Sequence, residues 1–156
     1  MEKKILIAVD DSENAMRAVE YVADSFSKEN SLTLFSIVLD TPAICDMNSP
    51  SLTPYFMSQK DVFCTVEDQK KLLVKDALKK AKEVLLEAGF KEGKITVKLE
   101  DKKKGIARGI VDEAKSGYDT IVLGRRGLSG IKEFFLGSVA MKVLHSAADI
   151  SVLLVN

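Results

Sequence analysis

The segment KILIAVDDS at residues 4–12 decides the fold class of this chain. Its first six residues form an almost uninterrupted apolar run of strand length, without polar alternation. Strands of this kind are typical of parallel sheets that are covered on both faces. The run stops at Asp10, and Ser12 is well suited to cap a following helix with Glu13 in its first turn. The segment therefore predicts a buried parallel strand that leads directly into a helix.

Strand and helix patterns alternate through most of the chain. Apolar runs predict strands, and apolar residues at helical spacing predict the helices between them. The expected strands are 4–9, 32–39, 95–99, 120–123 and 150–155, and the expected helices are 12–28, 66–88, 102–116 and 137–147. This order predicts an α/β fold with a single open five-stranded parallel sheet, strand order 3-2-1-4-5, and helices on both faces. We expect residues 1–156 to form one domain, with the polar-alternating third strand at an edge.

Residues 41–66 break this alternation. All three prolines of the chain fall here, so the stretch is predicted to be a long loop after the second strand. Loops longer than about 12–15 residues are uncommon in compact domains, and this one is rich in apolar side chains, so we expect it to fold over the domain or a partner. Cys45 and Cys64 also lie in it. Without a CxxC motif they are expected to be free thiols, with a redox pair as the alternative.

The composition argues against several classes of protein. Lys+Arg and Asp+Glu both number 23, so the formal net charge is zero, which disfavours a nucleic-acid-binding domain. No stretch reaches the roughly 18 consecutive apolar residues of a membrane span, and the first apolar run is too short for a signal peptide. We therefore expect a cytoplasmic protein that binds neither nucleic acid nor a membrane.

Four of the nine glycines fall within 14 residues, 124–137, after the predicted fourth strand. Glycine lets the backbone approach a ligand closely, and the helix that Ser138 opens offers N–H groups to a phosphate. Arg125 and Arg126 can add positive charge. Because the strand order reverses between strands one and four, this loop should face Asp10 across the crevice where such sheets bind ligands. The alternative is that the glycines only shape a turn and cap the helix.

The spacing Gly124-x2-Gly127-x9-Gly137-Ser138 fits the motif G-x2-G-x9-G-[ST]. With this motif, and with ILIAVDDSENAMRAVEYV at its start, the chain resembles the ATP-binding universal stress proteins everywhere except in 41–66. The motifs GxxxxGK[ST], and GxGxxG after strand one, are absent. The resemblance implies an ATP-binding protein of the stress response, usually a homodimer, that binds ATP (or ADP or AMP) with Mg²⁺.

The resemblance also implies a role for individual residues. Asp10 would bind near the adenine and ribose, the backbone of Val38 would contact adenine, and the glycine motif would hold the ribose and phosphates. With the two arginines, the predicted nucleotide-binding residues are Asp10, Val38, Gly124, Arg125, Arg126, Gly127, Gly137, Ser138 and Val139. Two positions depart from the family's pattern: Asp11 stands where glycine is frequent, and Ser151 stands where the last strand usually begins with Pro-Val.

Three alternatives compete with an ATP-dependent switch. A response-regulator receiver would need an aspartate ending strand three and a lysine ending strand five, whereas these segments end Glu100-Asp101 and Val155-Asn156. An enzyme would need a nucleophile–base pair, and the only histidine, His145, lies near the end of the last helix, so no catalytic residue is assigned and at most slow ATP hydrolysis is expected. A family member that dimerises without nucleotide would not need the intact glycine motif.

The strand 150–155 bears on assembly. It is apolar and expected at a sheet edge, which is a liability unless it is covered or paired. Pairing with the same strand of a second chain would form an isologous homodimer; the alternative is that the loop 41–66 covers the edge. We expect ATP occupancy to bias this loop or the dimer, and so to change binding to a protein partner that the sequence does not identify.

Overall fold

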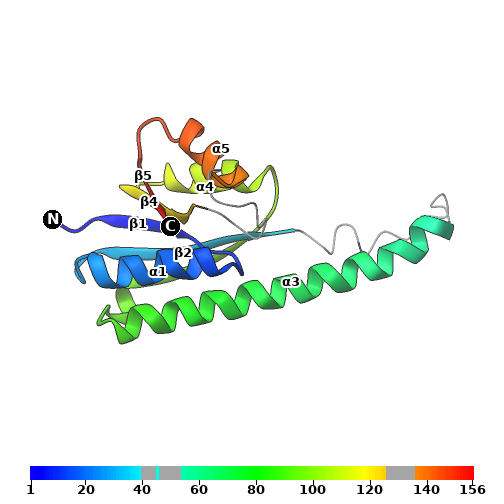
Figure 1. Cartoon of the computed structure of the whole chain (residues 1–156), viewed down its shortest axis with the longest axis horizontal. Coiled ribbons are helices and arrows are strands. Elements are labelled where there is room, and N and C mark those ends of the chain that lie inside the picture. The colour runs from blue at the N-terminus through cyan, green and yellow to red at the C-terminus, as the bar shows by residue number, and fades with distance from the viewer. Residues whose placement is uncertain (40–44, 46–53, 126–135) are drawn as a thin grey trace.

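The computed structural model describes residues 1–39, 45, 54–125 and 136–156. Five strands form one parallel sheet in the order β3-β2-β1-β4-β5, which confirms the predicted topology (Figure 1). The central strand is β1, and the edges are β3 and β5. The strands are β1 (Lys4–Ala8), β2 (Ser31–Val38), β3 (Ile95–Asp101), β4 (Thr120–Gly124) and β5 (Ser151–Val155).

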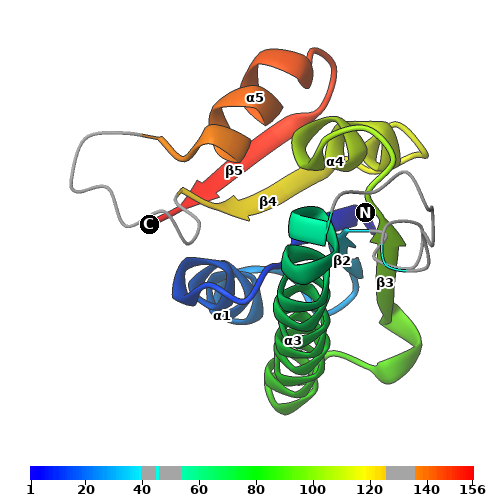
Figure 2. The same cartoon turned by 90° about the vertical axis from the view of Figure 1, so that its right-hand side faces the viewer.

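Helices cover both faces of the sheet, as predicted. Figure 2 shows α1 and α3 on one side and α4 and α5 on the other. Two clusters of buried side chains correspond to these two sides. The helices are α1 (Glu13–Ser25), α3 (Pro54–Glu87), α4 (Ile106–Ala114) and α5 (Ser138–Ser146), with a short 3-10 helix, η1 (Glu92–Lys94), before β3.

The central strand β1 is apolar on both of its sides because both faces of the sheet are covered. Ile5 and Ile7 belong to the cluster under α1 and α3, whereas Leu6 belongs to the cluster under α4 and α5. All three side chains are 0% exposed. Successive side chains of a strand point to opposite faces, and burying each of these stabilises the fold by roughly 1.5–3 kcal/mol. The apolar run at residues 4–9 therefore packs against the helices on both faces of the sheet.

The loop predicted over 41–66 is wrong from residue 54 onward. The helix α3 begins at Pro54 and continues for 34 residues to Glu87. Proline is compatible with the first turn of a helix, where the backbone N–H has no intrahelical partner, so Pro54 starts the helix instead of breaking it. The helical pattern is hard to recognise because this part of α3 exposes apolar side chains. Within the described ranges, no helix is both long enough and apolar enough to cross a membrane.

A disulfide bond joins Cys45 to Cys64 on α3, with the two Cα atoms 6.1 Å apart. The expectation of two free thiols is therefore wrong, and the pairing corresponds to the alternative of a redox pair. The distance between the two cysteines could not be judged from the sequence because Cys64 was assigned to a loop. Apart from Cys45, residues 40–53 lie outside the described part of the chain, so the predicted loop there stays a prediction.

Reduction of this disulfide is expected to lower the free energy of unfolding. The bond joins residues 19 apart in the sequence, and closing a loop of this size in the unfolded chain corresponds to about 3 kcal/mol. Urea unfolding with and without a reductant measures the difference. The double variant Cys45→Ser/Cys64→Ser should match reduced wild type under both conditions. Equal stability of the oxidised and reduced wild type would contradict this account.

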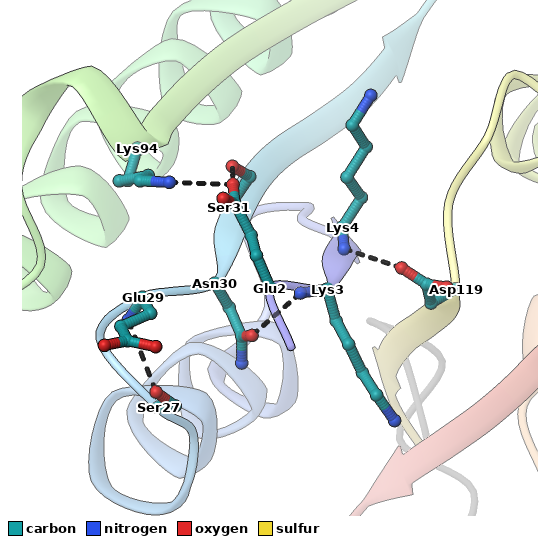
Figure 3. Close-up of polar contacts among 9 residues, drawn as sticks. All are labelled: Glu2, Lys3, Lys4, Ser27, Glu29, Asn30, Ser31, Lys94 and Asp119. Atoms are coloured by element: carbon teal, nitrogen blue, oxygen red, sulfur yellow. Dashed lines mark hydrogen bonds and ion pairs between the residues drawn. The ribbon is translucent and has the colours of Figure 1, made fainter.

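Polar contacts join the segments at the amino ends of the strands (Figure 3). The backbone N–H of Lys4 donates to Asp119 Oδ2 at 2.8 Å. Glu2 Oε1 accepts from Ser31 Oγ at 2.6 Å and lies 2.7 Å from Lys94 Nζ, and the hydrogen bond from Lys94 lowers the pKa of Glu2 below its ordinary value. The segments that begin β1 to β4 are thus connected at this end of the sheet, opposite the end that holds the cavity.

Candidate functional site

A cavity of about 380 Å³ opens at the carboxyl ends of β1, β2 and β4. Its walls come from the residues that follow these strands and β3, from the first turn of α5, and from α3 and α4. The strand order changes direction between β1 and β4, and open α/β sheets bind their ligands at such a point. The cavity therefore lies where the sequence predicted a crevice.

Seven of the nine residues that the sequence assigned to nucleotide binding line this cavity. The other two, Arg126 and Gly127, lie outside the described residues. The seven come from the ends of three strands and from the start of α5, so segments from both halves of the chain meet around one space. They are Asp10, Val38, Gly124, Arg125, Gly137, Ser138 and Val139.

The carboxylate of Asp10 is fixed by the start of α1. Its Oδ1 accepts hydrogen bonds from the backbone N–H of Ser12, at 2.9 Å, and from the Ser12 hydroxyl. Ser12 Oγ in turn accepts from the N–H of Ala15 at 3.2 Å, which confirms the predicted helix cap. One serine therefore begins α1 and also holds Asp10 in the cavity wall.

The amino end of α5 presents its backbone to the same cavity. Gly137 is the N-cap residue; its N–H donates to the carbonyl of Arg125 at 2.9 Å, and its carbonyl accepts from Met141 at 3.0 Å. No side chain of the described residues caps this helix. The first N–H groups of a helix have no intrahelical partner, and here they belong to Ser138 and Val139, which line the cavity. Together with the helix dipole they form a site suited to an anion.

Gly124 has a structural role besides its place in the cavity wall. A Cβ atom added to it would lie 2.8 Å from the backbone C and O atoms of Asn14. Only a residue without a side chain lets α1 approach the end of β4 this closely. This close contact directly supports the alternative that Gly124 is needed for the fold, independently of any contact with a ligand.

The guanidinium of Arg125 is held by the end of the chain. Its Nη1 donates to Asn156 Oδ1 at 3.2 Å, and the backbone N–H of Arg125 donates to the carbonyl of Val155 at 2.8 Å. Arg125 lines the main cavity and also a neighbouring hollow beside Arg17. Its positive charge therefore lies near the phosphate end of the predicted site but is bonded to a neutral amide in this structure.

Val38 lies in the cavity wall, and its backbone carbonyl already accepts one hydrogen bond. Its carbonyl accepts a hydrogen bond from the N–H of Lys102 at 2.6 Å. A carbonyl oxygen carries two lone pairs, so one remains for a ligand. Lys102 itself lines the cavity and was not predicted as a site residue: the predicted strand order places the end of β3 beside the end of β2, but Lys102 belongs to no motif that marks it as a ligand-binding residue.

The sequence assignments missed the cavity wall from α3, and they noted Asp11 as a departure from the family's pattern without placing it among the nucleotide-binding residues. Glu67, Lys70 and Lys71 line the cavity, and their spacing is that of one face of a helix. The spacing could be read from the sequence, but the sequence does not show that this face of the helix lines the cavity. Asp11 lines the cavity too, and its Oδ1 is buried with no hydrogen-bond partner among the described residues. A buried acceptor of this kind is costly unless a donor reaches it.

The cavity carries charges of both signs. Three carboxylates and four cations line it: Asp10, Asp11, Glu67, Lys70, Lys71, Lys102 and Arg125. None of the ion pairs between described residues joins one of these carboxylates to one of these cations. In the same ranges, no group of three His, Cys, Asp or Glu side chains is arranged to hold a metal ion. The charges are thus available to a polar ligand.

Known proteins resemble the chain over almost its whole length. The model of the universal stress protein family matches residues 1–156. YxiE of Bacillus subtilis is 31% identical over 144 residues, covering 92% of both chains. Sll1388 of Synechocystis is 31% identical over 162 residues, covering 98% of this chain and 97% of its own. A universal stress protein of Mycolicibacterium smegmatis is 26% identical over 148 residues, and this chain spans 46% of that longer protein.

Solved structures share the fold. UspA of Lactobacillus plantarum superposes with a TM-score of 0.72 at 22% identity, covering 99% of this chain and 97% of its own. A universal stress protein in complex with cAMP gives a TM-score of 0.64 at 18% identity, with 99% and 97% covered. The sheet order, the family match over the full length and the two relatives at 31% identity agree: the chain belongs to the universal stress protein family.

Proposed function

We propose that this chain binds an adenine nucleotide, ATP foremost, in the cavity at the carboxyl ends of β1, β2 and β4. The observation that carries the proposal is that the uncapped amino end of α5 and the carboxylate of Asp10 line the same cavity. The first suits phosphate, and the second can accept hydrogen bonds from a ribose or a base. Further support comes from the G-x2-G-x9-G-[ST] spacing and from a relative of the same fold that was crystallised with cAMP.

The cavity fits such a ligand in size and polarity. Its volume of about 380 Å³ lies within the roughly 300–1,000 Å³ of small-molecule sites. The phosphates would lie at Gly137, Ser138 and Val139, the ribose near Gly124, and adenine near the free lone pair of Val38. The buried Oδ1 of Asp11 has no donor in the part of the chain that the structure describes, and both the ribose hydroxyls and the adenine amino group are donors.

Mg²⁺ would be held mainly by the phosphates themselves. Mg²⁺ keeps several waters and needs only one or two protein carboxylates when it is bound with a nucleotide. Asp10 and Asp11 are the carboxylates that follow β1 in the cavity wall. The lack of a three-ligand group in the described part of the chain is consistent with a metal that enters together with the phosphates.

We further propose that nucleotide occupancy acts as a cytoplasmic switch. The helix α3 contributes Glu67 and Lys71 to the cavity, and it carries the disulfide to Cys45 in the segment after β2. A nucleotide in the cavity would therefore contact α5 on one side and α3 on the other. Its presence would bias the position of α3, and through it the contacts with a partner.

Titration calorimetry with ATP and Mg²⁺ on the wild-type chain tests the binding. We expect saturable binding with one nucleotide per chain, and weaker binding of AMP, which brings fewer phosphate charges to α5. ADP, GTP and cAMP serve as comparisons for the phosphate and base. If neither ATP nor another adenine nucleotide binds at millimolar concentration, the proposed function is wrong.

We also propose a homodimer through β5. This edge strand has an exposed Ser151, half-buried residues over 152–154, and no neighbouring strand on its outer side among the described residues. Edge strands of this kind are commonly paired or covered. Sedimentation equilibrium at micromolar concentration is expected to give twice the chain mass. A mass of one chain across the concentration range would contradict dimerisation.

A further inference from the structure

The first half of α3 projects beyond the sheet (Figure 1), and it exposes apolar side chains. Tyr55, Val62, Val66 and Leu73 are 76%, 62%, 54% and 55% exposed. They are seven, four and seven residues apart. At about 100° per residue, all four lie within about 40° of one another around the helix. We call this row of side chains the α3 stripe.

Neither the sheet nor the disulfide covers the α3 stripe. Val74 and Leu78, two of the α3 side chains that are buried in the core, lie about 100° and 140° around the helix from Tyr55. Cys64 lies two residues from both Val62 and Val66, which is about 200° around the helix in each direction. The bond to Cys45 is therefore on the opposite side of α3 from the stripe.

The α3 stripe is symmetric about residue 64. Tyr55 and Leu73 are each nine residues from this point, and Val62 and Val66 are each two residues from it. If α3 of a second copy runs antiparallel across the stripe, Tyr55 of each copy lies against Leu73 of the other. Val62 of each copy likewise lies against Val66 of the other. Such a relation is what an isologous, twofold interface requires. A partner of different sequence would not need this symmetry.

The polar positions of the stripe follow the same symmetry. Gln59 and Gln69 lie between the apolar residues and are each five residues from the centre. A side-chain amide is both a donor and an acceptor, so the two glutamines can bond to each other across the pair. Lys70 lies about 60° around the helix from the stripe, and Asp61 and Glu67 lie about 120° from it on either side, so the charges around the stripe are of both signs. The uniformly basic polar face of a helix that binds an anionic membrane is absent from this part of α3.

We propose that the α3 stripe is an interface between two copies of this chain, formed by antiparallel pairing of α3 about residue 64. The stripe is about 27 Å long, so the contact belongs to the small interfaces and its formation depends on concentration. This interface is separate from β5, which lies at one edge of the sheet. A chain with both interfaces forms assemblies larger than a dimer.

A directed disulfide exchange tests the geometry. Val62→Cys protein is activated as the mixed disulfide with 2-thiopyridine and is then mixed with Val66→Cys protein. The thiolate introduced at position 66 attacks the activated sulfur at position 62, forms the interchain disulfide and releases 2-thiopyridone, which is measured by its absorbance. Val62 and Val66 face each other in the pair, so the exchange is expected to be about tenfold or more faster than between unassociated chains. The native Cys45–Cys64 bond stays in place under these non-reducing conditions.

The control exchange uses activated Leu73→Cys with Val66→Cys. These positions lie on the same stripe, but in the pair they are separated by about 16 Å along the helix, so this exchange should proceed at the unassociated rate. A β5 dimer alone would give equal rates for both pairs, and equal rates would overturn the proposal.

Sedimentation provides a second measurement that does not depend on introduced thiols. Val66→Glu should lower the fraction of the larger species, whereas Lys75→Glu, on the opposite side of α3, should leave it unchanged. An unchanged distribution for Val66→Glu would also overturn the proposal.

Discussion

Ser138→Asp is expected to weaken ATP binding by about 100-fold or more, because a carboxylate about 4 Å from a phosphate charge costs roughly 4 kcal/mol near a protein surface. The substituted side chain lies in the first turn of α5, where the nucleotide phosphates are proposed to bind. An acidic residue there interacts favourably with the helix dipole, by about 0.3–1 kcal/mol. The free energy of unfolding should therefore stay the same or rise slightly while the affinity falls.

Two variants separate the effect of charge from that of the hydroxyl. Ser138→Ala removes one hydrogen bond to a charged group, which corresponds to about 1.5–3 kcal/mol, and so weakens binding less than the aspartate does. Ser146→Asp adds the same charge at the exposed other end of α5 and should leave the affinity unchanged. Titration calorimetry and urea unfolding are measured on all three. If Ser138→Asp binds ATP like the wild type, the phosphates do not lie at α5.

Gly124→Ala is expected to lower the free energy of unfolding by about 3 kcal/mol, at the upper end of the usual cost of overpacking. The added Cβ would lie 2.8 Å from the backbone of Asn14. That backbone belongs to α1, which packs on the central strands and cannot yield as a flexible side chain does. For a chain of this size the midpoint of thermal unfolding should fall by roughly 6–12 °C.

Gly93→Ala is the matched control for this substitution. A Cβ on Gly93 meets no atom within 4 Å, and the backbone there does not require positive φ. Its stability should therefore remain near that of the wild type, and urea unfolding compares the two variants. Equal stability of Gly124→Ala and Gly93→Ala would mean that α1 moves away from β4 at little cost. Loss of ATP binding in Gly124→Ala, taken alone, would say little about ligand contact, because the variant alters the packing of α1.

The sheet could be predicted from the sequence because its signals are local. The apolar run that contains Ile5 and Ile7 and the regular alternation of strands and helices both depend on neighbouring residues. The capping of α1 by Ser12 is equally local. The alternation predicts a parallel sheet, and ligands of such sheets bind at the carboxyl ends of the strands, where the cavity lies.

The unpredicted features depend on contacts between distant segments. Whether Cys45 reaches Cys64 follows from where α3 begins, and the start at Pro54 was hidden by prolines and exposed apolar residues. The buried oxygen of Asp11 and the place of Lys71 in the cavity wall likewise need the packed arrangement. Gly124 was assigned to a ligand from its motif, whereas the contact with Asn14 became visible only when α1 was packed on the sheet.

One uninterrupted helix, α3, carries both the cavity residue Lys71 and the exposed Val62 and Val66. If a bound nucleotide changes the position of this helix, it also changes the free energy of pairing between two copies. Thermodynamic linkage then makes the effect mutual, since self-association must change nucleotide affinity by the same factor. The affinity of this protein for ATP should consequently vary with its own concentration, so that protein abundance becomes a second input to the same switch.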